Sequence, residues 1–248
     1  MKFTNGVLED TRTPAEIQKN YLDKELLFES PLVWEDFEVW KKKPENIKLL
    51  AEIQNMDQDG SGSCLAQAGT LALAINNYRK EGRFIPMSAR PIYLRRNNRP
   101  MAGMWMDDLG KILTEWGTVF ESLFASQKMG EEEMNKEDGY LRSFDALGKI
   151  YSAEKYIWVH NKIDSVAQIL NLQFPVVLGF RFGDGEWNRV DPIIKDSPKY
   201  GHGVCAIPRG FFTYKGKKAI LIQDSWGVNS GWNGRRIITE DWNSANSV

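Results

Sequence analysis

The clearest hydrophobic pattern in the chain is an alanine- and leucine-rich run that follows a loop of glycine and serine. The apolar residues that share one face at helical spacing are Leu65, Ala68, Leu71, Ala72 and Ile75. The loop spans residues 58–63, and Ser63 stands where a helix N-cap stands. The pattern therefore predicts a helix that begins at Cys64.

Weaker patterns predict the remaining elements. A helix is expected to follow residues 102–109 and to run to Trp116, where Gly117 ends it. Another is expected to start at Asp164 or Ser165 and to continue through Leu170. Apolar runs predict four strands, at residues 156–159, 175–180, 201–207 and 219–224. The acidic stretch 131–139 is predicted to be a surface insertion.

The first fifty residues are charged and mixed. Thr13 and Pro14 predict a capped helix start, and we expect the lysine run 41–43 to lie in a solvated loop. Residues 1–50 are therefore interpreted as an arm packed on the body of the protein. A second basic group lacks the interleaved aromatic residues of a nucleic-acid surface and is interpreted as an exposed structural loop; its members are Arg90, Arg95, Arg96 and Arg99.

Composition narrows the functional classes. The chain has 248 residues, of which 42% are hydrophobic and 26% charged, so one compact unit of two lobes is expected. The net charge of -1 provides no basic field for nucleic acid. Residues 1–6 lack the apolar core of a signal peptide, and no apolar run is long enough to span a bilayer. These features favour cytosolic synthesis, with neither nucleic acid nor membrane as a partner.

Cys64 is the candidate nucleophile. The N–H groups and the positive end of the helix dipole favour an anion in a first helical turn, so a thiol there is biased toward the reactive thiolate. The other cysteine, Cys205, lies in an apolar run and is expected to be a small buried hydrophobe. Neither a metal nor a cofactor is expected. Residues 57–62 look like the start of a calcium loop, but its twelfth residue would be Ala68, or Ala66 in a second register, rather than glutamate.

A thiolate that attacks an acyl group needs a histidine that can protonate the leaving amine. The chain contains only two histidines. His160 has no motif around it and is interpreted as structural. His202 lies between Gly201 and Gly203 at the start of an apolar run, which would leave its ring accessible. We therefore predict His202 as the base.

These motifs resemble the papain-like cysteine proteases. In that family a glutamine six residues before the nucleophile donates to the oxyanion, which implies this role for Gln58. The 138 residues between the two catalytic positions fall in the family's range of roughly 130–150. Residues 224–227 resemble the family's Asn-Ser-Trp-Gly box, which implies that Asp224 orients His202 and that Trp226 shields their hydrogen bond. Three positions depart from the pattern: Ser61 replaces a cysteine, Leu65 an aromatic residue and Asp224 an asparagine.

The resemblance implies an α+β, two-lobed fold with the active site in a cleft. A helical lobe is expected over residues 51–145 and a β-rich, barrel-like lobe over 146–248. Gly103 is expected to pair with the substrate backbone. Met104 and Trp105 are expected at the mouth of an apolar subsite, with Tyr200 and Gly203 across the cleft. The cysteine replaced by Ser61 normally forms a disulfide, so its loss suits a reducing compartment and favours a bacterial or phage protein.

The resemblance implies a cysteine endopeptidase that hydrolyses polypeptides through a thioester acyl-enzyme. Three alternatives stay open: a cell-wall peptidase or amidase, a catalytically silent peptide-binding homologue, and a transglutaminase-type acyl transferase. Because asparagine is the family's residue at the orienting position, Asp224→Asn is expected to stay active. The sequence does not indicate an oligomeric state.

Overall fold

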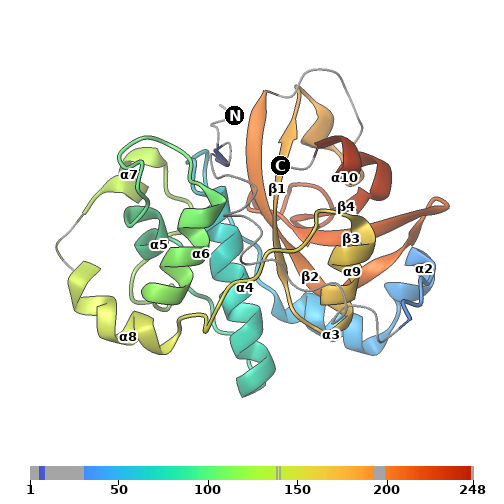
Figure 1. Cartoon of the computed structure of the whole chain (residues 1–248), viewed down its shortest axis with the longest axis horizontal. Coiled ribbons are helices and arrows are strands. Elements are labelled where there is room, and N and C mark those ends of the chain that lie inside the picture. The colour runs from blue at the N-terminus through green and yellow to red at the C-terminus, as the bar shows by residue number, and fades with distance from the viewer. Residues whose placement is uncertain (1–5, 9–30, 138, 140, 193–198, 247–248) are drawn as a thin grey trace.

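The computed structural model describes residues 6–8, 31–137, 139, 141–192 and 199–246 (Figure 1). The helix start predicted at Thr13 and Pro14, and most of the predicted arm before residue 31, lie outside these residues. In the described residues helices combine with an antiparallel sheet. In Figure 1 a group of short helices lies on one side of the long central helix, and the sheet lies on the other side together with the remaining helices.

The central helix is α4, Cys64–Glu81, which begins at the predicted residue. It ends at Gly82, whose left-handed backbone (φ 74°) is the conformation that glycine adopts without strain. On one side of α4 lie the shorter helices of the helical half. They are α5 (Arg90–Leu94), α6 (Met106–Glu115), α7 (Glu131–Asn135), η2 (Leu141–Phe144) and α8 (Asp145–Ile150). The helix predicted to end at Gly117 is confirmed as α6.

The sheet contains four strands in the order β1-β2-β3-β4, and each pairs antiparallel with its neighbour. They are β1 (Val176–Phe182), β2 (Tyr200–Tyr214), β3 (Lys217–Gln223) and β4 (Arg235–Thr239). The β2–β3 register shifts between Ala206 and Phe211, where Arg209 has a left-handed backbone (φ 59°). Such a bulge bends a long strand, so β2 contributes to both ends of the sheet.

The remaining elements pack around the sheet. They are α2 (Phe37–Trp40), α3 (Pro44–Glu52), α9 (Ile163–Asn171), η3 (Glu186–Asn188) and α10 (Glu240–Asn246). One buried cluster joins α9, η3 and α10 to the sheet and includes Trp187 and Trp242. Another joins α2 and α4 to the opposite side and includes Trp40 and Leu71. Burial of each such side chain stabilises the fold by about 1.5–3 kcal/mol, so the second cluster fixes α4 against β2.

Two expectations from the sequence are wrong. Residues 156–159 form no strand; Tyr156 packs edge-on against Trp158 and its ring covers Gly110 of α6. The basic group around α5 is not an exposed loop, because Arg90 and Arg96 are buried. The acidic stretch 131–139 does lie at the surface, and α7 within it packs against α5 and buries Met134 completely.

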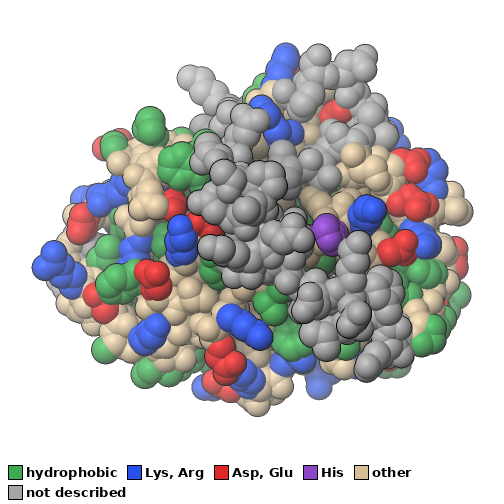
Figure 2. Space-filling model, in the orientation of Figure 1, with side chains coloured by type: hydrophobic (Ala, Val, Ile, Leu, Met, Phe, Trp, Pro, Cys, Tyr) green, Lys and Arg blue, Asp and Glu red, His purple; other side chains and the backbone are tan. Residues whose placement is uncertain are grey.

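Within the part of the chain that the structure describes, no helix combines the length and the apolar character that crossing a bilayer requires. On the face shown in Figure 2, acidic and basic side chains are interspersed over the described surface rather than gathered by sign.

Candidate active site

The first turn of α4 holds Cys64 at the junction between the helical half and the sheet. Its thiol is 1% exposed and accepts a hydrogen bond from the Gly203 N–H of β2 at 3.2 Å. Ser63 occupies the N-cap position, but its side chain makes no capping bond and its hydroxyl pairs with that of Ser61 at 2.7 Å. The predicted N-cap position of Ser63 and the predicted place of the cysteine in the first turn are therefore confirmed.

Gly203 lets β2 approach α4 closely at this junction. A Cβ atom at this position would lie 2.8 Å from the Leu65 Cα of α4. Real Cβ atoms do not approach a backbone this closely, so only glycine lets β2 come within reach of Cys64. Its backbone is buried against the helix, and its expected place beside a substrate pocket stays a prediction.

His202 lies next to Cys64 and is 3% exposed. Its Nε2 lies 2.7 Å from Asp224 Oδ1, which leaves Nδ1 as the ring nitrogen for the thiol. Burial lowers the pKa of His202, but the charges of Asp224 and Cys64 and the hydrogen bonds to both outweigh burial and raise this pKa to about 9. At neutral pH the ring is therefore charged and can give a proton away.

The Asp224 carboxylate has donors on both oxygens. Oδ1 faces His202 and accepts the Ser225 N–H at 2.7 Å, while Oδ2 accepts the Trp187 indole N–H at 2.8 Å and lies 3.0 Å from Arg236 Nη2. Burial raises the pKa of Asp224, but the positive charges of His202 and Arg236 and these hydrogen bonds lower it below its ordinary value. The carboxylate is therefore ionised and can only accept from His202.

Aromatic rings surround the histidine. The ring centroids of Trp226 and Trp187 lie 5.2 and 5.3 Å from that of His202, and Phe182 lies 6.1 Å away. Trp226 is half-buried and covers the histidine as the resemblance implied, whereas Trp187 was not predicted. Trp187 lies on η3, between β1 and β2, where no spacing in the sequence links it to the site.

Gln58 is held by the Trp-Gly box. Its Oε1 accepts from the Ser225 hydroxyl at 2.5 Å, and its Nε2 donates to the Ser61 carbonyl at 2.5 Å. Its backbone N–H also donates to the Ser225 carbonyl at 2.9 Å. The segment that carries Asp224 thus orients the Gln58 amide. One of the two Nε2 hydrogens bonds to the Ser61 carbonyl.

Glu131 of α7 supports the loop before Cys64. Its carboxylate accepts the Gly62 N–H at 2.7 Å and the Tyr93 hydroxyl at 2.8 Å. The Tyr93 oxygen in turn accepts the Gly103 N–H at 3.1 Å. This chain of bonds ties the nucleophile loop to the segment before α6. It also means that the Gly103 N–H is bonded within the protein in this structure, while its expected pairing with substrate stays a prediction.

The segment Gly6–Leu8 occupies the space where substrate was expected. Met104 donates its N–H to the Gly6 carbonyl at 3.0 Å and accepts the Leu8 N–H at 3.0 Å, in a parallel bridge. On the other side, the Gly6 N–H donates to the Gly201 carbonyl at 2.9 Å. A Cβ atom on Gly6 would lie only 2.0 Å from Cys64 Sγ, so the segment covers the thiol.

The other predicted subsite residues surround the Gly6–Leu8 segment or flank it. Met104 supplies the backbone pairing, and its completely buried side chain belongs to the same cluster as Val7. Trp105 is half-buried at the N-cap of α6. Tyr200 is half-buried, packs on Phe182 and donates its hydroxyl to Asp184 at 2.8 Å. The apolar subsite therefore stays a prediction.

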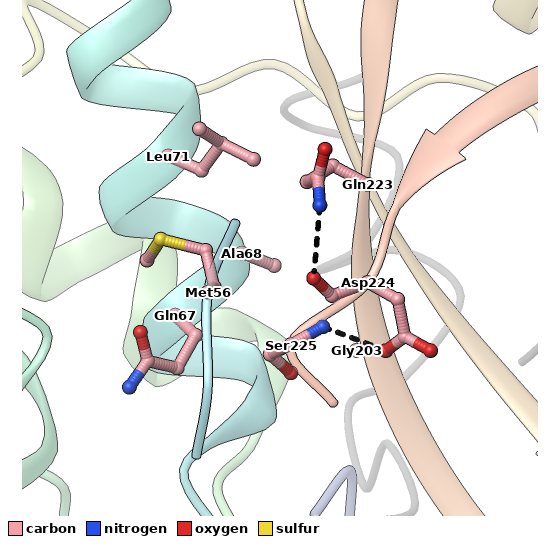
Figure 3. Close-up of a pocket in the computed structure, with 8 residues that line it drawn as sticks. All are labelled: Met56, Gln67, Ala68, Leu71, Gly203, Gln223, Asp224 and Ser225. Atoms are coloured by element: carbon pink, nitrogen blue, oxygen red, sulfur yellow. Dashed lines mark hydrogen bonds between the residues drawn. The ribbon is translucent and has the colours of Figure 1, made fainter. Parts of the chain in front are cut away.

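A narrow space lies behind the catalytic side chains, between α4 and the sheet (Figure 3). It is too narrow for a water molecule, and its lining comprises Met56, Gln67, Ala68, Leu71, Gly203, Gln223, Asp224 and Ser225. The space is therefore a packing gap between the helix and the strands and not a ligand pocket. Among the described residues, no cluster of three or more histidine, cysteine, aspartate or glutamate side chains could hold a metal ion.

Solved structures share this fold. Xylellain, a cysteine protease from Xylella fastidiosa, is 20% identical with a TM-score of 0.72, over 98% of this chain and 92% of that one. Procathepsin L 3 from the larval midgut of Tenebrio molitor is 18% identical with a TM-score of 0.68, over 92% and 73%. The ragweed pollen cysteine protease Amb a 11, in its proform, is 14% identical with a TM-score of 0.60, over 90% and 66%.

No protein-family model and no curated protein sequence matches the chain. At these identities the solved structures establish the fold: the chain has the two-lobed papain-like α+β fold that the sequence motifs implied. The neighbours themselves are cysteine proteases.

Proposed function

We propose that this chain is a papain-like cysteine endopeptidase that cleaves polypeptides through a thioester acyl-enzyme. The observation that supports this most is the continuous sequence of contacts from Cys64 through His202 to Asp224, on a fold shared with cysteine proteases. A nucleophile, a base and a group that orients the base are the three parts that acyl transfer by a thiol requires.

In the proposed reaction the Cys64 thiolate attacks the scissile carbonyl and forms a tetrahedral oxyanion. The His202 imidazolium then gives its proton to the leaving amine, and a thioester remains on the sulfur. Neutral His202 next takes a proton from water, which attacks the thioester and releases the acid. The raised pKa of His202 supports the first proton transfer, because the ring is protonated at neutral pH.

The oxyanion is stabilised by the Cys64 backbone N–H and by the Gln58 side-chain amide. The network around Gln58 supports this role, because Ser225 holds Oε1 and so fixes which face of the amide presents its N–H groups. Loss of one such donor typically slows the chemical step by about 10²–10³-fold. Gln58→Ala is therefore expected to fall in this range.

The resting state of this enzyme is closed by its own Gly6–Leu8 segment. The backbone pairs of that segment with Met104 and Gly201 use the groups that an extended substrate would use. Hydrolysis therefore requires the segment to leave. Two of the neighbouring structures are precursor forms, which agrees with a closed state of this kind.

Mass spectrometry of peptides generated from a mixed protein substrate tests the proposal. Cleavage by the wild type and none by Cys64→Ala is the expected result, and labelling of Cys64 by an epoxide thiol trap would accompany it. Cys205→Ser is the matched control, because its thiol is equally buried and burial raises its pKa strongly. Turnover of peptidoglycan fragments in place of proteins would indicate a cell-wall peptidase, and labelling with no turnover would indicate a silent homologue. Cytosolic synthesis and a bacterial or phage origin stay predictions.

A further inference from the structure

A buried arginine lies next to the residue that orients the histidine. Arg236, on β4, is 1% exposed, and its Nη2 lies 3.0 Å from Oδ2 of Asp224, whose side chain is completely buried. The register of the sheet brings Arg236 next to Asp224, because Arg236 pairs with Ile222 of β3, two residues before Asp224. Nothing in the mechanism proposed above uses this cation.

The carboxylate lies between two cations, one on each oxygen. Oδ1 lies 2.7 Å from His202 Nε2, and Oδ2 lies 3.0 Å from Arg236 Nη2. A single carboxylate of charge −1 thus faces a permanent positive charge on one side and a titrating ring on the other. The arginine balances the charge that distinguishes aspartate from the asparagine of the papain-like pattern.

The arginine is held in place independently of Asp224. Its Nη1 donates to the Arg189 carbonyl at 3.0 Å and its Nη2 to the Ser230 hydroxyl at 2.5 Å. Its guanidinium carbon lies 5.0 Å from the ring centroid of Trp187 and 5.6 Å from that of Trp226, the two rings that cover His202. Packing and hydrogen bonds therefore fix its position relative to the histidine.

The charged groups around this unit come from four elements. His202 faces it from β2, Cys64 from α4 through the histidine, and Arg236 from β4. Glu186, the residue before Trp187 on η3, is also buried, but its carboxylate accepts the Gly183 N–H at 2.5 Å. Arg236 is thus the cation that acts on Asp224 besides His202 itself.

We propose that Arg236 is a positioning residue of the active site, which forms with Asp224 a neutral unit that orients His202 as a single uncharged amide would. The inference rests on the proposed function in that it assumes a reacting Cys64–His202 pair. Without Arg236, Asp224 would hold the imidazolium more tightly, and the ring would release its proton to the leaving amine less readily. Without Asp224, Arg236 would be an unpaired buried cation beside the histidine.

The arginine therefore changes the expectation for Asp224→Asn. Asparagine was expected to sustain activity because the papain-like pattern contains it. In this chain that variant leaves the positive charge of Arg236 buried and unpaired. The variant that restores a neutral site is the double one, Asp224→Asn/Arg236→Met.

The test measures two pH profiles that do not need peptide cleavage: the NMR titration of the His202 ring and the rate at which iodoacetamide alkylates Cys64. The second histidine, His160, is exposed, and a His160→Gln variant assigns the two ring signals. Arg236→Met is expected to raise the His202 midpoint by about one pH unit, and Asp224→Asn to lower it by more than that. The double variant is expected to lie between them and to cleave peptide at least about tenfold faster than Asp224→Asn.

Arg235→Met is the matched control. Arg235 is the neighbour of Arg236 and also buried, but its Nη2 donates to the Leu50 carbonyl at 2.7 Å on the other side of the strand. It should leave both profiles in place. Arg236→Lys keeps the charge if Arg236→Met does not fold, and it is expected to keep the His202 midpoint within about half a pH unit of the wild type.

Equal His202 midpoints in the wild type and Arg236→Met would overturn the inference. So would a wild type that cleaves peptide together with a double variant no faster than Asp224→Asn. If the folded Arg236→Lys protein shifts the midpoint by a full unit or more, charge is not what Arg236 contributes, which also overturns it. Shifted titrations in a protein that cleaves no peptide would instead reject the proposed function and leave the inference standing.

Discussion

The closed state leads to a prediction about Gly6, a residue that has no reactive side chain. Alanine there adds a single Cβ atom, which would lie 2.0 Å from Cys64 Sγ and 3.4 Å from the Gly201 carbonyl oxygen. The Gly201 carbonyl belongs to β2 and cannot retreat, and Cys64 Sγ can turn aside only by giving up its hydrogen bond from the Gly203 N–H. The Gly6–Leu8 segment must therefore leave its place, and the thiol becomes accessible.

The size of the effect follows from what holds the segment. Three backbone hydrogen bonds contribute about 1 kcal/mol each. The side chain of Val7, which is 8% exposed, adds about 2 kcal/mol by burial. Ordering three residues opposes this with about 1–2 kcal/mol per residue. The remaining stabilisation of the closed state is on the order of 1 kcal/mol, which corresponds to an about fivefold excess of closed over open protein.

Gly6→Ala is therefore expected to raise kcat/KM for a fluorogenic peptide by about fivefold, and to speed alkylation of Cys64 by a similar factor. Val7→Asp should also raise both rates, because it places a charge at a buried apolar position. Gly130→Ala is the control, since a Cβ there would have no neighbour closer than 4.0 Å. Unchanged rates in both Gly6→Ala and Val7→Asp would refute the idea that this segment blocks the enzyme.

Other predictions follow from the site. Cys64→Ala should abolish hydrolysis, whereas Cys205→Ser should retain it; loss of activity in a folded Cys205→Ser protein would show that the nucleophile is misassigned. Ser225→Ala should lower kcat about tenfold with little change in KM, because it releases the oriented amide of Gln58, and an unaltered kcat would remove Gln58 from the oxyanion site. The raised pKa of His202 stabilises the fold fully below about pH 6.5, and this stabilisation is lost as the pH rises through about 9. Urea denaturation should accordingly show a fall of up to about 3 kcal/mol over that interval, and a smaller one in Asp224→Asn; a flat profile would contradict the coupling. A positional peptide library should show preference for a hydrophobic residue second from the scissile bond on the amino side, and a charged preference would reject the apolar subsite.

The parts of the site that the sequence predicts are those encoded locally. A glycine- and serine-rich loop before an alanine-rich run marks the start of α4, and the 224–227 box marks the segment that meets His202. Both carry their signal within a few residues. The fold follows from the same motifs, because the nucleophile loop, the histidine and the 224–227 box stand in the order of the papain-like pattern.

The parts that the sequence does not predict depend on pairing between distant segments. Trp187 reaches Asp224 across 37 residues, and Arg236 does so only because β3 and β4 pair in one register. The aromatic run at 156–159 has strand propensity, but its rings pack locally on α6. Propensity alone does not decide between these outcomes, because strand formation depends on cross-strand partners. The Gly6–Leu8 segment likewise carries no local signal for its place beside Cys64.

The buried pair also constrains how this chain can have evolved from one with a neutral site. A change to aspartate at position 224 can come first, because the charged histidine still partners the new carboxylate. A change to arginine at position 236 cannot, because it would place an unpaired cation in a completely buried position. Aspartate should therefore precede arginine in any ancestral series. Among relatives, arginine at the second position should occur only together with aspartate at the first, as residues in contact tend to change together.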